Sequence, residues 1–451
     1  MGLSETWQSI GAVVIFAGVI FLLMAEWVHL TIAAFLGAML LIFLNILTLT
    51  EAIDYIGKGY STLSLFFGVM VLVRAFEPTK IFEYLATKIV IWSGGQGRRL
   101  LLGLVGLTTI CTAFLPNATT VMLLAPLIPP MAQEIGVDFV PLLILITFVA
   151  NSGSLLTLVG DPVTFLVGDA INMNFTDYFV RLGGSGIVAI GTLIALLPWL
   201  FRRTWQKQLD NLDKLPHPQI NHSRTLTIGI VIVVFVLIFF VIGEYLPVPI
   251  TPAAVALMGA ALALLLSHHS KIESVNQILS DVDWSTLIFF MSFFVLIGSL
   301  EKTGIINRLS QLLALALNQN IFLGSLALLF LIGFLSSVVP NIPLVVAMIP
   351  LLKQSVVNLD LAGPEILSPS FDGNLPSAVL PLFYAMMIGA TLGGNGTLAG
   401  ASANIVAAGI SELHDRRISF KRFLRYGVPV MVFQLITGAV YLLLLTLIKV
   451  G

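Results

Sequence analysis

The chain has 451 residues, of which 58 % are hydrophobic and 10 % are charged, and its mean hydropathy is +1.02. Soluble domains carry roughly a quarter charged residues, so this composition excludes an ordinary soluble protein and predicts an all-α, multi-pass protein in a lipid bilayer. The net charge of −1 predicts no nucleic-acid partner, and a single cysteine, Cys111, excludes an internal disulfide.

Apolar runs of about 20 residues, long enough to cross a bilayer, recur along the chain. In the first part of the chain they lie near 9–27, 30–49, 60–76, 139–169 and 178–201, and in the second part near 225–244, 250–267, 284–301, 379–411 and 424–448. Each part also contains two shorter apolar arms around a Pro-Asn pair, which are 100–115 with 118–133 and 321–339 with 342–357.

Three segments of the first part match segments of the second part in the same order. "YSTLSLFFGVMVLVRAFEPTKI" matches "WSTLIFFMSFFVLIGSLEKTGI", and "FLPNATTVMLLAP" matches "VVPNIPLVVAMIP", both 224 residues later. "TLVGDPVTFLVG" matches "TLAGASANIVAAG" 240 residues later, after an inserted loop "LDLAGPEILSPSFDGN". The sequence therefore predicts two homologous repeats, 1–210 and 215–451.

The arms are compatible with ordinary spans or with re-entrant hairpins. With hairpins, each repeat makes five crossings, and the second repeat is inverted. This topology leaves six basic residues on one side, namely Lys58, Arg181, Lys302, Arg308, Lys353 and Lys449, and the other sixteen of the 22 Lys and Arg on the opposite side. The positive-inside rule assigns the side with more Lys and Arg to the cytoplasm, which places both termini on the outer side of the cell membrane. The hairpin near 100–133 then opens to the cytoplasm, and that near 321–357 to the outside.

Polar residues at membrane depth predict a binding site. Irregular backbone is tolerated there only inside protein or beside a cavity, and inverted repeats with broken helices are typical of secondary transporters. Helix N-termini at such breaks offer N–H groups to an anion. The alternatives are that each Asn caps its own arm and that the glycines serve helix packing. Apart from Asp161, the predicted ion-binding residues are Asn117, Thr119, Thr120, Asn151, Ser152, Gly153, Ser154, Asn341, Gly394, Asn395, Gly396, Thr397, Ser402 and Asn404.

Asp161 is the one acidic residue expected inside a span rather than in a loop or at a span end. An ionisable residue at membrane depth is a functional candidate, and its alternative role is to cap the helix that follows. Its counterpart in the second repeat is Ala401. No metal-binding or nucleophilic constellation is visible, so we expect no catalytic residues, no metal and no cofactor. A coupling ion, Na⁺ or H⁺, stays open.

These motifs, together with "LGGNGTLAGASANIVAAGISELHDRRISFKRFLRYGVPVMV", resemble the arsenite and sodium–proton permease branch of the ion transporter superfamily over nearly the whole chain. The pattern is most similar to the P protein of the pink-eyed dilution type, and distantly similar to sodium–dicarboxylate symporters. The resemblance implies inverted repeats, Asn-containing hairpin tips, broken helices and a homodimer.

The chain departs from this family at the tips and in one break. P-protein-like members carry Asp before each tip Asn, where this chain has Pro116 and Pro340, and Thr164 takes the place of the Asn in "GDPPN". Fewer carboxylates weaken a cation site. We therefore expect a permease for a small inorganic ion, favouring an anion such as chloride. A sodium–proton antiporter, an arsenite extruder, an anion channel and a membrane protein without conductance are the alternatives.

Overall fold

The computed structural model describes residues 3–25, 27–208, 220–317, 320–368, 371 and 373–447. Helices dominate these residues, and the described part of the chain contains no β-strand, only one isolated bridge between Gln96 and Gln208. The proposed boundary between the repeats and Lys449 lie outside the described residues. The predicted all-α class is confirmed.

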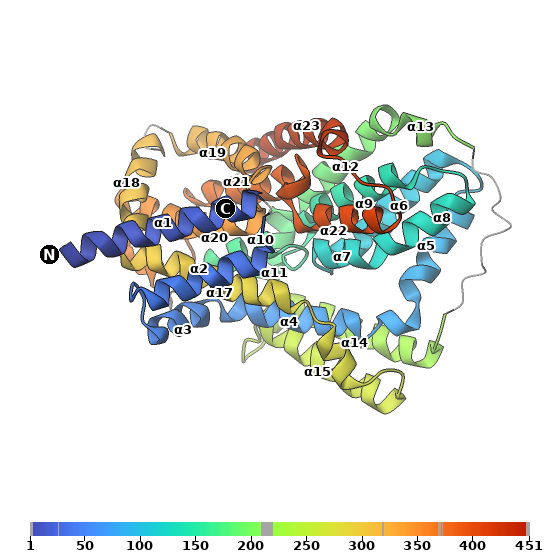
Figure 1. Cartoon of the computed structure of the whole chain (residues 1–451), viewed down its shortest axis with the longest axis horizontal. Helices are drawn as coiled ribbons and strands as arrows, with labels where there is room; N and C mark the ends of the chain where they lie inside the picture. Colours follow the sequence, from blue (N-terminus) through green and yellow to red (C-terminus); the bar gives the residue numbers. More distant parts are fainter. Residues whose placement is uncertain are drawn as a thin grey trace.

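Figure 1 shows the helices of the described chain, which we divide into two halves between α13 and α14. The first half contains α1 Leu3–Ala25, α2 Leu30–Phe43, α3 Leu49–Lys58, α4 Tyr60–Arg74, α5 Ile81–Trp92, α6 Gly97–Thr112, α7 Asn117–Leu124, α8 Ile128–Glu134, α9 Phe139–Gly153, α10 Pro162–Ala170, α11 Phe175–Arg181, α12 Gly183–Leu200 and α13 Arg202–Trp205. The second half contains α14 Ser223–Ile242, α15 Pro252–Ser270, α16 Val275–Ser280, α17 Trp284–Lys302, α18 Ile305–Leu317, α19 Ile321–Ser336, α20 Asn341–Asn358, α21 Leu380–Gly393, α22 Ser402–Leu413 and α23 Phe420–Leu447.

Nine helical segments of the described chain are long and apolar enough to cross a membrane. Eight of them coincide with predicted spans, and the ninth is α20, an arm of the second hairpin. The other two predicted spans, 30–49 and 379–411, contain the shorter apolar helices α2 and α21. The protein is therefore a multi-pass membrane protein, as the composition predicts.

Several helices lie where the sequence predicts only loops or continuous arms. α3, α5, α16 and α18 fall in segments expected as loops, and the predicted span 30–49 ends as a helix at Phe43. The arm predicted for 118–133 is divided into α7 and α8 by a 3₁₀ turn at Ala125–Leu127, which contains Pro126. Proline removes a helical N–H donor and interrupts the ladder at this point.

Several contacts between a helix of the first half and a helix of the second half occur twice, the second time between their counterparts in the opposite halves. α4 packs on α15 and its counterpart α17 packs on α2, whereas α7 packs on α22 and its counterpart α20 packs on α10. α12 packs on its own counterpart α23. Such reciprocal pairing is expected of two repeats related by a pseudo-two-fold axis. α5 and its counterpart α18 lie at opposite ends of the molecule (Figure 1). The inversion of the second repeat in a membrane stays a prediction.

The two hairpins turn with nearly identical backbone geometry. Pro116 has φ −52° and ψ 141°, Pro340 has φ −51° and ψ 139°, and each immediately precedes a helix that begins at Asn. The ring of proline fixes φ, and the absence of its N–H ends the preceding arm. The second hairpin also packs closely on the helix that follows it: a Cβ at Gly393 would lie 2.2 Å from the carbonyl oxygen of Gly333.

Candidate functional site

The first hairpin tip is joined to the broken helix of its own repeat. Asn117 is buried at the start of α7, where its Oδ1 accepts the N–H of Ala118 at 2.8 Å. Its amide nitrogen donates to Oδ1 of Asn151 at 3.1 Å, near the end of α9. Asn117 therefore satisfies one N–H in the first turn of its own arm and also takes part in a wider cluster, while ion binding at this residue stays a prediction.

Asn151 connects the two repeats. Its amide nitrogen donates to Oδ1 of Asn395 at 3.0 Å and to Oδ1 of Asn404 at 3.2 Å. Asn404 lies in the first turn of α22, which packs on α7, and all three side chains are buried. The first hairpin tip thus meets the broken helix of the opposite repeat.

Two further buried side chains extend the cluster toward α23. Asn395 donates to Oγ of Ser152 at 3.1 Å and to Oε1 of Gln434 at 2.8 Å. Gln434 donates to the same Oγ of Ser152 at 2.7 Å and to the carbonyl oxygen of Ala189 at 3.0 Å. We call Asn117, Asn151, Ser152, Asn395, Asn404 and Gln434 the central amide network. Its members are all neutral.

Asp161 is buried beside this network. Its Oδ1 accepts the N–H of Val163 at 3.2 Å, so it caps α10. Its Oδ2 accepts the hydroxyls of Thr391 at 3.2 Å and Ser154 at 3.4 Å, and Ser154 also donates to the carbonyl oxygen of Asn151. Among the described residues, Asp161 is the only buried Asp, Glu, Lys or Arg. The capping role that the sequence left open is present, and a proton-carrying role is compatible with the same position.

The unwound segments are held by matching contacts in the two repeats. Thr157 donates to the carbonyl oxygen of Ala113, and its counterpart Thr397 donates to that of Ser337. Asn404 donates to the carbonyl oxygens of Gly394 at 2.8 Å and Thr397 at 2.9 Å. These bonds satisfy backbone carbonyls that leave the helix at membrane depth.

The predicted glycines lie at close contacts between elements. A Cβ at Gly396 would lie 2.5 Å from Sδ of Met431, one at Gly153 2.7 Å from Cγ2 of Thr112, and one at Gly394 3.2 Å from the carbonyl oxygen of Gly400. These contacts support the packing role considered from the sequence, and ion binding at these glycines stays a prediction.

The remaining predicted residues lie outside the network. Asn341 is buried and its Oδ1 accepts the N–H of Ile342 at 2.9 Å, while its amide nitrogen donates to no other described residue. Thr120 is buried with no partner for its hydroxyl in the described chain, and Ser402 is half-buried at the start of α22. Asn341 and Thr120 thus offer unused polar groups at or near the two tips.

A crevice of 260 Å³ reaches the first hairpin from one side and is lined by Thr119 and Met122 of α7. Its opposite wall carries acidic residues: Glu77, Asp281 and Asp283. Arg74 pairs with Asp281 at 2.5 Å and with Glu77 at 3.4 Å, so it compensates part of this negative charge. Thr119 therefore lines a crevice whose acidic charge is only partly compensated.

Two residues of the site, Gln434 and Thr391, are not predicted from the sequence. Gln434 is the single amide in the middle of an apolar span, "VPVMVFQLITGAV", and that isolation is a signal of a buried polar contact. Thr391 directly precedes the glycine-rich break and gave no such signal, because a threonine hydroxyl can satisfy itself on its own helix.

Comparisons with known proteins agree with this architecture. The family model for citrate transporters, CitMHS, matches residues 20–370. A protein of Synechocystis sp. named as an uncharacterized transporter is 66% identical over 427 residues, 95% of this chain and 95% of its own length. An uncharacterized transporter of Mycobacterium tuberculosis is 30% identical over 444 residues, 96% of this chain and 98% of its own.

Two further similarities bear on the resemblance and the fold. The P protein of Sus scrofa is 30% identical over 519 aligned positions, which cover 96% of this chain but 59% of the P protein. The crystal structure of the YdaH transporter of Alcanivorax borkumensis, described as having an unusual topology, matches with a TM-score of 0.58 at 12% identity, over 87% of this chain and 86% of that one. The resemblance to the ion transporter superfamily is confirmed, and the structural match confirms the fold.

Proposed function

This chain belongs to the citrate transporter family, CitMHS, and is therefore a transporter; on that premise we propose that it moves a small anion across the cell membrane by alternating access. The observation that carries the proposal is the central amide network, in which side chains of both repeats meet at the first hairpin tip. In transporters with inverted repeats, binding sites lie at the interface between the repeats.

The chemistry of the network favours an anion. Asn and Gln amides and Ser hydroxyls donate hydrogen bonds without adding a fixed charge, and α7, α10 and α22 begin at residues in or beside the network. Helix N-termini present N–H groups and the positive end of the helix dipole. An anion would take over the bonds that the amides now make to one another. Asn341 lies outside this network, but its helix α20 packs on α10, and we propose that its unused amide nitrogen is brought to the ion when the two tips close on it.

Chloride is our first candidate substrate, since it needs only a few neutral donors. A small carboxylate is the second anion to test, because the matched family is described by citrate. Arsenite, which resemblance to a related permease branch suggests and which is mostly uncharged As(OH)₃ near neutral pH, completes the panel.

One observation favours a different candidate, a sodium–proton antiporter. The crevice beside Thr119 carries Glu77, Asp281 and Asp283, an arrangement that attracts cations. Asp161 is the buried carboxylate that such a cycle would protonate. A sodium- or proton-coupled anion symporter would use both features together.

The packing suggests which parts move. We assign the spans near 30–76 and 250–301, which contain α2–α4 and α15–α17, as a scaffold that also forms a homodimer, and the hairpins and broken helices as a transport unit. The scaffold helices pair among themselves, and they contact the transport unit mainly through α4 with α10 and α17 with α20. Both termini are proposed to lie outside the cell. Cross-linking of the purified protein that yields only monomers would contradict the dimer.

Flux into proteoliposomes tests the function directly. Purified protein is reconstituted and uptake of chloride, citrate, a dicarboxylate, arsenite and sodium is measured with and without gradients of Na⁺ and H⁺. The proposal expects saturable anion uptake. Sodium–proton exchange without anion flux would favour the antiporter, purely electrodiffusive anion flux would favour a channel, and no flux of any ion would favour a structural protein.

A further inference from the structure

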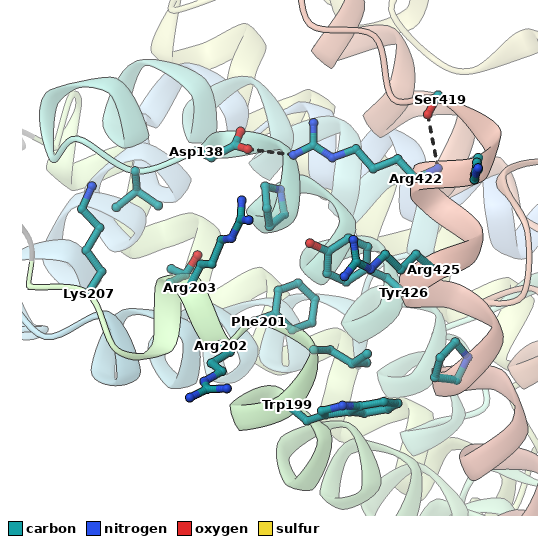
Figure 2. A pocket seen from close by; sticks show the side chains of 16 residues that line it. Asp138, Trp199, Phe201, Arg202, Arg203, Lys207, Ser419, Arg422, Arg425 and Tyr426 are labelled. Carbon is teal, nitrogen blue, oxygen red and sulfur yellow. Dashed lines mark hydrogen bonds and ion pairs between the residues drawn. The ribbon is translucent and has the colours of Figure 1, made fainter.

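A large basic cavity lies away from the central amide network, at one end of α12 and α23. It has a volume of 1030 Å³ and opens between α13, the start of α9 and the start of α23 (Figure 2). We call it the basic groove; its basic lining residues are Arg202, Arg203, Lys207, Lys421, Arg422 and Arg425. Asp138 is the one acidic residue among its described lining residues. The groove therefore carries a strong positive charge.

Most of this charge is not neutralised within the described chain. Arg422 pairs with Asp138 at 2.7 Å, and Arg416, outside the groove, pairs with the same carboxylate at 3.3 Å. Arg203 and Arg425 make no ion pair with any described residue. Figure 2 shows the guanidinium groups of Arg203, Arg422 and Arg425 turned toward the space between α13 and α23. Planar guanidinium groups bind phosphate oxygens in pairs, which distinguishes them from a diffuse cationic surface.

The groove lies where a membrane meets water. α12 is an apolar span that ends at Leu200, two residues before the basic pair Arg202 and Arg203. Trp199, which lines the groove, is 62% exposed on that span, and the ring of Tyr426 lies 5.2 Å from that of Phe201. Tryptophan and tyrosine concentrate at the headgroup level of bilayers. The groove thus has aromatic and apolar residues on the side of the membrane span and basic residues beyond the end of that span.

The other repeat provides an internal comparison. Val137, Asp138 and Pro141 of the groove correspond to Ser377, Ala378 and Pro381, 240 residues later, and those residues line a second cavity of 790 Å³ at the end of α23. The described lining of that second cavity contains no charged side chain. The repeated fold therefore produces a cavity in both halves without requiring charge. The positive-inside rule already accounts for basic residues on the side where this groove opens, so the feature that points to a ligand is the convergence of several of them on one cavity.

We propose that the basic groove binds one anionic phospholipid, with Arg203, Arg422 and Arg425 on its phosphate. The acyl chains would lie on the apolar faces of α12 and α23 beside the groove, where Ile194 and Val428 are 37% and 40% exposed. Basic pockets between membrane helices on the cytoplasmic side are suited to anionic headgroups. The aromatic wall and the exposed span favour a lipid over a soluble phosphate compound. This site is separate from the proposed transport site and does not depend on its substrate.

Binding to purified, delipidated full-length protein in neutral detergent tests the proposal by native mass spectrometry. The probes are phosphatidylglycerol, phosphatidylethanolamine with the same chains, glycerol phosphate and inorganic phosphate. We expect one phosphatidylglycerol per chain, retained at least about tenfold more tightly than phosphatidylethanolamine. Glycerol phosphate and inorganic phosphate should not displace the bound phosphatidylglycerol when each is added at the concentration at which the lipid saturates the groove.

Matched double variants separate a site from general positive charge. Arg203→Gln with Arg425→Gln should lose the tight phosphatidylglycerol, and Arg203→Lys with Arg425→Lys, which keeps the charge, should retain part of it. Lys88→Gln with Arg224→Gln removes the same charge from exposed positions outside the groove and should bind as the unaltered protein does. Equal loss in the groove and control variants, equal binding of both lipids, or competition by the soluble phosphates would overturn the proposal. Unchanged thermal midpoints establish that all variants are folded.

Discussion

The amide nitrogen of Asn151 donates to Oδ1 of Asn404 at 3.2 Å, and these two buried residues belong to opposite repeats. Asn151 lies in the last turn of α9, and Asn404 lies in the first turn of α22. Any motion that separates the two helices must replace this bond, because an unpaired buried amide costs about 1–3 kcal/mol. A bound ion or water that takes over the bond would couple occupancy to that motion.

The close contact between α19 and α21 should make Gly393 intolerant of a side chain. In Gly393→Ala, the added methyl meets the carbonyl oxygen of Gly333 at 2.2 Å, and overpacking of this kind costs about 1–3 kcal/mol. We expect a lower thermal midpoint in detergent. Gly106→Ala is the control, because no atom outside the local backbone of its own helix lies within 4 Å of the added methyl. It should leave stability equal or slightly higher. Equal effects of the two substitutions would contradict the packing.

Stability in acid should depend on Glu51. Its carboxylate accepts the ammonium of Lys302 and the N–H of Thr48, and these contacts lower its pKa from 4.5 to about 2. A lowered folded-state pKa contributes stability above pH 4.5 that is lost as the pH falls toward 2. The contribution is small, since the Glu51 and Lys302 side chains are each 35% exposed.

Thermal midpoints between pH 7 and pH 2 check this prediction. Glu51→Gln keeps an N-terminal cap for α3 but removes the charge, so it should lower the midpoint at pH 7 and flatten its fall below pH 4.5. Asp54→Asn, at an exposed position of the same helix, is the control. Curves for Glu51→Gln and the unaltered protein that stay parallel over the whole range would refute the role of this pair.

Cysteine labelling tests the inverted topology. In a Cys111→Ala background, single cysteines at the exposed positions of Asp54 and Asp360 should react with an impermeant reagent from outside intact cells. Cysteines at Arg99 and Arg417 should react only after the membrane is opened. If positions 99 and 360 are labelled from the same side, the second repeat is not inverted.

Asp161→Asn separates a cap from a proton carrier. Asn keeps an acceptor for the N–H of Val163, and the hydroxyls of Thr391 and Ser154 can reorient toward the new amide, so the fold should be preserved. If Asp161 carries a proton, transport in the variant loses its pH dependence and its coupling. Coupled transport that is unchanged across pH would make the residue structural. Asp161→Ala, which removes the cap, should lower the thermal midpoint in either case.

The sequence predicts the existence of the hairpins and breaks because Pro, Asn and Asp are costly in an apolar run. It does not predict which helices meet: the pairing of Asn117 with Asn151, and through it with α22, depends on how the two repeats pack. α5 and α18 are not predicted as helices, because they are shorter than the neighbouring spans and mix polar with apolar residues, a pattern that is also typical of loops between spans. The basic groove was visible only as charges counted toward topology, because its shape requires α13 and α23 to be placed side by side.

The most direct test of the central claim is anion flux through variants of the two hairpin tips. Asn117→Ala breaks the bond to Asn151, and Asn341→Ala removes the unused donor at the second tip. Asn358→Ala is the control, at the far end of α20, where its amide bonds Oγ of Ser310 at 3.0 Å. With equal amounts of folded protein in liposomes, we expect each tip variant to lose at least about tenfold in flux, as the loss of about 1.4 kcal/mol of binding implies, while the control transports normally. Normal flux in both tip variants would contradict the account.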